Sequence, residues 1–247
     1  MTSRACLLPA FAASLFSASM LSPASAQGPK VGDPPEASNM RQVGMNDLQA
    51  RSAYQPIIQK QGDRYIAYVG HHGGTTAVPK PVNPMTGQAE FNGTSVIDVT
   101  NPAQPKYLKH IPGEEGAGEK GGGQMVRVCG GAAFKGDAGA FYLLRTFGNT
   151  AHEIWNVTDP ANPKLIVRLD GLKGTHKSFW ECDTGIAYLV SGVPEWRSAR
   201  MTQVYDLSNP AKPVHIRDFG LPGQEPGSSG PVPTGLHGGI STGPQGN

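Results

Sequence analysis

Short apolar runs recur along the chain, and three of them open the same longer phrase. The phrase reads SVIDVTNPAQPKYLKHI at 95–111, EIWNVTDPANPKLIVRL at 153–169 and QVYDLSNPAKPVHIRDF at 203–219. Each opening run is rich in β-branched and aromatic residues and is too short for a helix, so it indicates a strand. Self-similarity at a period of roughly 50 residues is typical of a repeat architecture.

A tight turn is expected after each opening strand. Asn-Pro or Asp-Pro pairs begin at Asn101, Asp159 and Asn209, where Asn or Asp suits the first turn position and Pro presets φ for the second. A second proline soon afterwards starts the next apolar run, so each phrase predicts a β-hairpin with a rigid loop. The polar residue that ends each first strand is expected to accept hydrogen bonds from the turn. These residues are Asp98, Asn156 and Asp206.

Two further strand patterns precede each hairpin, which makes four short strands per unit. They lie at 54–60 and 64–70, at 124–129 and 140–146, and at 176–182 and 186–191. Four antiparallel strands with turns between them describe one blade of a β-propeller. Residues 39–247 are therefore predicted to form an all-β domain, an incomplete β-propeller of four-stranded antiparallel blades. The predicted blades cover about 54–112, 123–170 and 175–220, and a fragment at 235–247 begins a fourth with a strand at Leu236–Ile240.

The number of predicted blades is small for a closed ring. A propeller usually contains ~4–8 blades, and this chain provides three and a fragment. We therefore expect the chain to be a C-terminally truncated version of a longer protein, whose ring is closed by strands beyond Asn247. Residues 41–48 resemble the outer strand of a last blade, which would complete such a ring.

The first 26 residues have the pattern of a secretory signal peptide. Arg4 precedes an apolar stretch of small residues, and Ala24-Ser25-Ala26 forms an A-x-A site, so cleavage is predicted after Ala26. Residues 27–38 are rich in Pro and Gly and are interpreted as a flexible linker. The protein is therefore expected to be secreted or periplasmic, with no membrane span in the mature chain.

Composition adds limits on the class of protein. The chain has 247 residues, of which 38% are hydrophobic and 16% are charged, so it can bury a core. A formal charge of only +2 gives no indication of a nucleic-acid partner. After removal of Cys6 with the signal peptide, Cys129 and Cys182 remain in an oxidising compartment. Their spacing alone leaves open whether they form a disulfide.

Several segments resemble a known family. The hairpin phrase, together with GHHGG at 70–74, NGTSVIDV at 92–99, AHEIW at 151–155 and GLHGGISTGPQGN at 235–247, resembles the bacterial secreted LVIVD-repeat β-propeller proteins. The resemblance covers nearly all of 39–247. It implies a propeller fold and a surface or periplasmic location, but it says little about activity, because members are mostly described without an assigned reaction.

Loops and strand ends on one face of a propeller are expected to bring polar side chains together. In a blade, the loop between the second and third strands and the loop between blades emerge on the same face. The residues predicted for a ligand-binding face are His71, Gln55, Gln124, Trp196 and Arg197. The long loop at 71–93 and the glycine-rich loop at 113–123 belong to this face, and binding residues often lie on loops held by a rigid scaffold.

Histidines from successive blades are candidates for a metal site at the mouth of the channel. Neutral imidazoles suit transition metals such as Cu, Zn, Fe or Ni. The candidate ligands are His176, His237, His72 and His152. For each of them the alternative is a structural histidine with satisfied hydrogen bonds at a strand end.

Three functions follow as hypotheses. The favoured one is a non-enzymatic propeller that binds a protein, a glycan or a small molecule through its loop-rich face. The second is a metal-dependent periplasmic oxidase or hydrolase that uses the channel-mouth histidines. The third is a structural repeat segment of a larger cell-surface protein. No GxSxG, HExxH or Walker sequence is present, and GAGEKG at 116–121 is followed by a strand pattern in place of the helix that dinucleotide binding requires.

Overall fold

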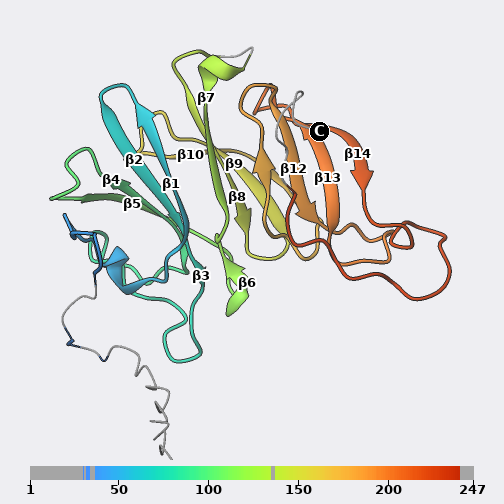
Figure 1. The fold of residues 1–247 in the computed structure, drawn as a ribbon, viewed down its shortest axis with the longest axis horizontal. Coiled ribbons are helices and arrows are strands. Elements are labelled where there is room, and N and C mark those ends of the chain that lie inside the picture. Colours follow the sequence, from blue (N-terminus) through green and yellow to red (C-terminus); the bar gives the residue numbers. More distant parts are fainter. Residues whose placement is uncertain (1–29, 31, 34–36, 135–136, 240–247) are drawn as a thin grey trace, which may run out of the picture. The chain divides into compact units, whose positions relative to one another are not determined.

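The computed structural model describes residues 30, 32–33, 37–134 and 137–239. The predicted signal peptide and most of the predicted linker lie outside the described residues. The chain divides into two units, Met1–Arg41 and Gln42–Asn247. Every strand that the structure describes belongs to the second unit (Figure 1).

Three four-stranded antiparallel sheets follow one another along the chain, as Figure 1 shows. Sheet 1 contains β1 (Tyr54–Gln61), β2 (Arg64–Gly70), β4 (Gly93–Asp98) and β5 (Lys106–Pro112). Sheet 2 contains β7 (Val126–Gly130), β8 (Phe141–Phe147), β9 (Ala151–Asn156) and β10 (Lys164–Leu169). Sheet 3 contains β11 (Phe179–Trp180), β12 (Ile186–Ser191), β13 (Met201–Asp206) and β14 (Val214–Phe219). In each sheet the strands lie side by side in chain order.

The remaining elements are short. β3 (His72–Gly73) pairs with β6 (Gly118–Gly122) in a two-stranded sheet. The helical elements of the described residues are two 3-10 turns, η1 (Leu48–Ala50) and η2 (Gly131–Ala133). The prediction of an all-β chain with three four-stranded antiparallel units is confirmed. None of the helices of the described residues is long and apolar enough to cross a membrane.

The three predicted hairpin turns use the same hydrogen bonds. The side chains of Asp98, Asn156 and Asp206 accept from the backbone N–H two residues further on, at 2.9, 3.0 and 2.8 Å. The Asn or Asp that begins each turn does the same, at 3.1, 3.0 and 3.1 Å. The predicted role of these polar residues as acceptors for the turn is confirmed.

Each outer strand also carries a β-bulge at the same place in the repeat. In the pairing of β4 with β5, of β9 with β10 and of β13 with β14, one residue of the outer strand has no partner in the ladder. These residues are Leu108, Ile166 and Ile216. A bulge increases the local twist of a strand, so the three outer strands bend alike. The three units therefore share the position of this β-bulge as well as their strand order, and the sequence pattern does not reveal the bulge.

Two hydrophobic clusters pack the sheets face to face. Successive side chains of a strand point to opposite faces, and in β8 Leu143 belongs to the first cluster and Leu144 to the second. The first cluster joins sheets 1 and 2 and includes Ile66, Tyr68, Val96, Val126 and Val157. The second joins sheets 2 and 3 and includes Cys129, Ile154, Trp180, Ala187 and Leu189. Sheet 2 is thus covered on both faces, which explains why its strands are apolar at successive positions.

A buried charge network reinforces the contact of sheets 1 and 2. Arg145 of β8 and Glu153 of β9 are 1% and 0% exposed, and they face each other in the strand pairing. The Glu153 carboxylate accepts from Arg145 Nε at 2.9 Å, from Arg168 Nε at 2.8 Å and from Trp155 Nε1 at 2.9 Å. Arg145 also donates to the carbonyl oxygen of Ile111 in sheet 1 at 2.9 Å. The network therefore ties β8, β9 and β10 to the end of β5.

Three strand predictions are wrong within the described residues. The first strand of sheet 3 spans only Phe179–Trp180 in place of 176–182. Residues 236–239 form no strand; Gly238 makes a single parallel bridge to Lys177, and residues 240–247 lie outside the described residues. Prolines at 231 and 233 remove two backbone donors, and Gly238 and Gly239 have no side chains to pack. Residues 41–47 also form no strand, in contrast to the outer strand expected there.

A disulfide joins sheets 2 and 3. Cys129, at 1% exposure in β7, bonds to Cys182, just after β11, across a Cα–Cα distance of 5.4 Å. Because the bond closes a loop of 53 residues, it restricts the unfolded chain strongly. The structure thus shows that Cys129 and Cys182 form a disulfide, which their spacing in the sequence left open.

We expect a Cys129→Ala, Cys182→Ala double variant to lose about 2–4 kcal/mol of unfolding free energy. Urea denaturation followed by Trp fluorescence would measure this loss. Wild-type protein treated with a reductant should show the same decrease. An unchanged denaturation midpoint in both samples would show that the two cysteines are not joined in solution.

Candidate functional site

The long loop at 71–93 is held in place by buried polar side chains. Arg51, which is 5% exposed, donates to Asn92 Oδ1 at 2.8 Å and to the carbonyl oxygens of Glu90 and Pro81. The Glu90 carboxylate accepts from His110 Nδ1 at 2.7 Å. Burial lowers the pKa of His110 to about 3, so its imidazole is neutral at neutral pH. The second half of this loop is therefore fixed to Arg51 and to β5 of sheet 1.

His71 has a structural role in place of the predicted contact with a ligand. It is 0% exposed, and its Nδ1 interacts with the carbonyl oxygen of Ser52. Its Nε2 lies 2.7 Å from Ser95 Oγ, which is itself 0% exposed. Burial lowers the pKa of His71 to about 4. A serine and a histidine at this distance resemble a nucleophile and its base, but neither side chain reaches solvent, so the pair has no access to a substrate.

Most of the other residues predicted for a ligand-binding face are also structural. Gln124 is 0% exposed, and its side-chain nitrogen donates to the carbonyl oxygen of Glu119. Arg197 donates to the carbonyl oxygens of Gly223 at 3.0 Å and Ser229 at 3.4 Å, which fixes the loop after β14. Trp196 packs closely on Gly220 at the beginning of that loop. Gln55 is exposed and has a positive φ of 44° at the irregular start of β1.

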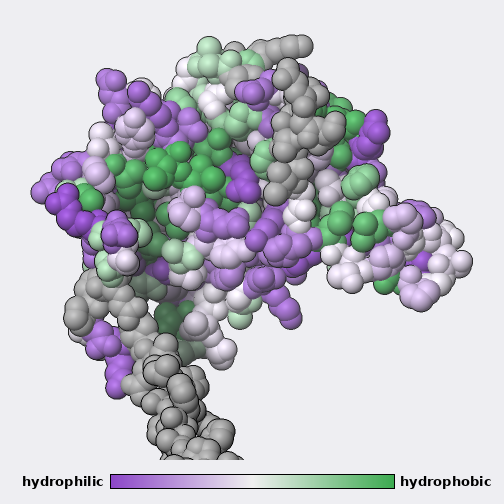
Figure 2. All heavy atoms as spheres, viewed as in Figure 1, coloured by the Kyte–Doolittle hydropathy of each residue, from purple (hydrophilic) through white to green (hydrophobic). Residues whose placement is uncertain are grey.

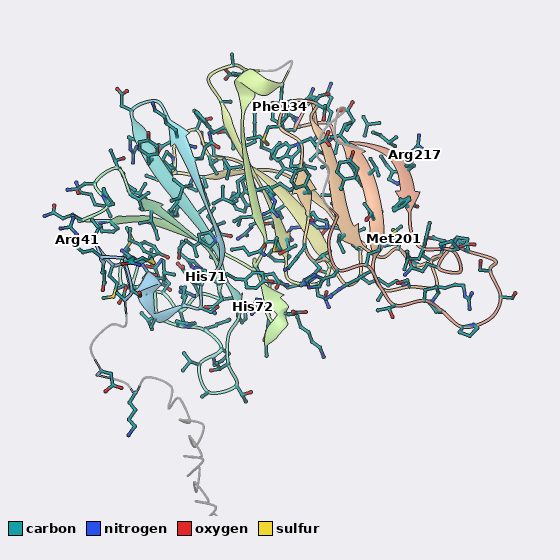
Figure 3. The ribbon with its side chains drawn as sticks, viewed as in Figure 1. Arg41, His71, His72, Phe134, Met201 and Arg217 are labelled. Atoms are coloured by element: carbon teal, nitrogen blue, oxygen red, sulfur yellow. A yellow bond between two sulfur atoms is a disulfide. The ribbon has the colours of Figure 1, made fainter. Side chains whose placement is uncertain are left out.

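His72 and the glycine-rich loop come together as a small sheet. His72, labelled in Figure 3 beside His71, begins β3, which pairs with β6. Gly122 has a φ of +80°, and a side chain there would collide with the backbone of β3. Glycine is therefore required for this close approach. The glycine-rich loop is thus paired with β3, and it carries Glu119, which interacts electrostatically with His72.

Distant segments of the chain meet around Glu119. Arg200 Nη2, from the residue before β13, lies 3.3 Å from a Glu119 carboxylate oxygen. The rings of His176 and His237 have centroids 4.7 Å apart and are nearly perpendicular. Desolvation raises the pKa of Glu119, but Arg200 and the nearby His176 and His72 outweigh it and lower the pKa. We call His72, Glu119, His176, Arg200 and His237 the histidine cluster.

His176 is the buried member of this cluster. It is 0% exposed, and neither of its ring nitrogens has a hydrogen-bond partner among the described residues. Burial, followed by the charge of Arg200, lowers its pKa to about 4, so the ring is neutral at neutral pH. A buried polar group without a partner is costly in a folded protein. The ring nitrogens of His176 are therefore unsatisfied, and they lie beneath the exposed ring of His237 without reaching solvent.

An open cavity of about 530 Å³ adjoins the histidine cluster at Arg200. Its wall is formed by the loop before β13 and by the segment that leads to His237. The lining residues are Asn149, Gly174, Arg197, Ser198, Ala199, Arg200, Val232, Pro233, Thr234 and Gly235. In Figure 2 the surface around β6 is polar, whereas an apolar area lies over β1 and β2. Cluster and cavity together form a concave region with several polar side chains.

The four candidate metal ligands do not form one ligand set in the structure. His176 and His237 lie together, and His72 is close to Glu119. His152 is 0% exposed in β9, where burial lowers its pKa to about 4. Within the described ranges, no group of three or more His, Cys, Asp or Glu side chains is arranged to hold a metal ion.

Two members of the cluster have no signal in the sequence. Glu119 lies in a glycine-rich stretch, and Arg200 lies in a loop, and neither has a motif spacing to the histidines. The only indication is that a carboxylate and an arginine occupy two loops predicted for the same face. Their pairing depends on how sheets 1, 2 and 3 stack, which local patterns do not specify.

Comparisons with known proteins give little further information. No protein-family model matches the chain, and no curated protein matches it either. Among solved structures, the chain is similar to the exo-β-1,3-galactanase of Phanerochaete chrysosporium bound to β-1,3-galactotriose, with a TM-score of 0.42 and 10% identity. The match covers 69% of this chain and 36% of the galactanase chain. A likeness this distant carries no argument about fold or activity.

Proposed function

We propose that the chain is a secreted β-propeller protein of the LVIVD-repeat type that acts as a binding module through its histidine cluster. The propeller is supported by three sheets of identical strand order that pack face to face through two hydrophobic clusters. The outer face of sheet 1 carries an apolar groove of about 470 Å³ where a further blade would pack. A disulfide supports an oxidising compartment.

One observation carries the binding function. The Glu119–Arg200 pair lies beside an open cavity, and the exposed His237 packs on the buried His176, whose ring nitrogens have no partner among the described residues. Ligand sites are typically concave, with a small number of converging polar groups. Residues from β3, from β6 and from three loops supply these groups, so the site exists only in the folded chain.

A thermal-shift screen tests the binding function. The panel contains neutral and acidic sugars, short oligosaccharides and small peptides, each added to wild type, His237→Gln and His215→Gln. His215 is an exposed histidine of β14 that pairs with Asp218 outside the cluster, so it is a matched control. At roughly 100 times its Kd, a ligand should raise the Tm of wild type and His215→Gln by about 5–10 °C, and that of His237→Gln much less. The proposal fails if no compound gives a shift that depends on His237.

A metal-dependent oxidase or hydrolase is the second candidate. The close approach of the His176 and His237 rings favours it, since two imidazoles provide part of a transition-metal site. Elemental analysis of natively purified protein tests it, with a His176→Ala, His237→Ala double variant as the comparison. Stoichiometric metal that is lost in the double variant supports this candidate, and the absence of metal from wild type rejects it.

A further inference from the structure

The charged side chains that line the cavity beside the histidine cluster are Arg197 and Arg200. Lys173 Nζ donates to the carbonyl oxygen of Trp196 at its edge. Three carboxylates lie nearby without lining the cavity. Glu119, which is 52% exposed, pairs with Arg200, Glu114 accepts from Asn149 N–H at 3.1 Å, and Glu225 interacts with the charge of Arg197. The lining itself is therefore cationic, which favours an anion.

Carbonyl oxygens hold both guanidinium groups in position. Arg200 Nε donates to the carbonyl oxygen of Gly174 at 3.1 Å, and its aliphatic stem packs between Gly174 and Gly235. Its Nη2 also pairs with the partly exposed Glu119. Arg197 donates to carbonyl oxygens of the loop after β14, which orient it without neutralising it. A carboxylate that enters the cavity would thus meet two ordered guanidinium groups, one of which it would share with Glu119.

A second feature indicates that the ligand also donates a hydrogen bond. Asn149 Oδ1 is buried and has no hydrogen-bond partner among the described residues. This oxygen accepts hydrogen bonds, so a hydroxyl or an ammonium group of a ligand could donate to it. The arginines and Lys173 would repel an ammonium group at short range. A hydroxyl group is therefore the better match to this oxygen.

We propose that the cavity binds a hydroxylated carboxylate, the chemical class to which sugar acids belong. The carboxylate pairs with Arg200, and a hydroxyl group donates to Asn149 Oδ1. This inference rests on the proposed binding function and names the ligand class of the same site.

Isothermal titration calorimetry with two probes tests the inference. D-glucuronate and D-glucose differ by one carboxylate and share their hydroxyl groups. We expect D-glucuronate to bind wild type at least tenfold more tightly than D-glucose. Arg200→Gln should weaken D-glucuronate binding by about ten- to a hundredfold, because charge-assisted hydrogen bonds are lost. Asn149→Asp, which is isosteric and adds a negative charge, should weaken it similarly.

Arg217→Gln is the matched control, because it removes the same charge from the exposed strand β14, away from the cavity (Figure 3). It should bind D-glucuronate like wild type. Circular dichroism of each variant verifies the fold. Equal affinity for both probes, no binding of D-glucuronate, or an unchanged Kd in Arg200→Gln overturns the inference. If a neutral sugar binds and its binding is lost in His237→Gln, the proposed binding function is retained and the hydroxylated-carboxylate ligand class is wrong. If the thermal-shift screen also gives no ligand whose effect depends on His237, both the binding function and the ligand class are wrong.

Discussion

Lowering the pH from about 7.5 to about 5.5 is expected to destabilise the folded chain by roughly 5 kcal/mol. His71, His110, His152 and His176 are 0–1% exposed, and burial lowers their pKa values to about 4, 3, 4 and 4. The pKa of an unfolded histidine is about 6.5. Above that value both states are neutral and the full stability is present. As the pH falls from about 6.5 towards about 4, the unfolded chain binds protons that the folded chain excludes, so stability is lost.

The size of this effect follows from proton linkage. Each buried histidine contributes up to about 1.4 kcal/mol per pH unit in this range, and four of them act together. A loss of roughly 5 kcal/mol is comparable with the whole stability of many domains, which is about 5–15 kcal/mol. Thermal denaturation by circular dichroism should show Tm falling by about 10–20 °C between the two pH values. A His71→Asn variant should show about three quarters of the wild-type slope. A Tm that is the same at both pH values would contradict the burial of these histidines.

Replacing Glu153 is expected to cost about 3–5 kcal/mol of unfolding free energy. Glu153→Gln keeps the shape of the side chain but removes the charge that compensates Arg145, and both residues are almost fully buried. Arg168 also loses its carboxylate partner. An unpaired guanidinium group within the core is far more costly than an exposed one. Chemical denaturation with urea would measure the change directly.

Two further variants separate the charge effect from a general loss of packing. Glu115→Gln removes an exposed carboxylate and should change the unfolding free energy by no more than about 0.5 kcal/mol. A Glu153→Leu, Arg145→Met double variant removes both charges and should be more stable than Glu153→Gln alone, because no buried charge remains unpaired. A double variant less stable than Glu153→Gln would show that the hydrogen bonds of Arg145 to sheet 1 dominate.

The sheets were predictable from the sequence because their signals are local. Apolar runs, the Asn/Asp-Pro pair and the polar residue that ends each first strand recur in every unit, and all three turns form the expected hydrogen bonds. The strand predicted at 236–240 does not form over its described residues, because a strand also needs a partner with a matching edge. Within the described residues Gly238 finds only one bridge, to Lys177. Strand extent is decided by neighbours, which a local pattern does not contain.

The candidate site was predictable only in part. The structure brings His176 and His237 together, and both were singled out in the sequence, but it buries His71 and His152. Whether a histidine at the end of a strand reaches solvent depends on the loop that covers it. The Arg145–Glu153 pair did leave a signal, since opposite charges occur within two adjacent apolar strands. Only the register of β8 against β9 shows that they meet.

We infer that distant segments of the chain build one ligand site at the histidine cluster. NMR spectra of the histidine ring nitrogens, recorded while D-glucuronate is added at neutral pH, would show whether they do. The signals of His237 and of His176, whose rings are in contact, should shift together and follow one binding curve, while those of His110 and His215 stay in place. Unchanged signals for His176 and His237, or a shift of His215 without them, would show that the ligand does not bind at this cluster.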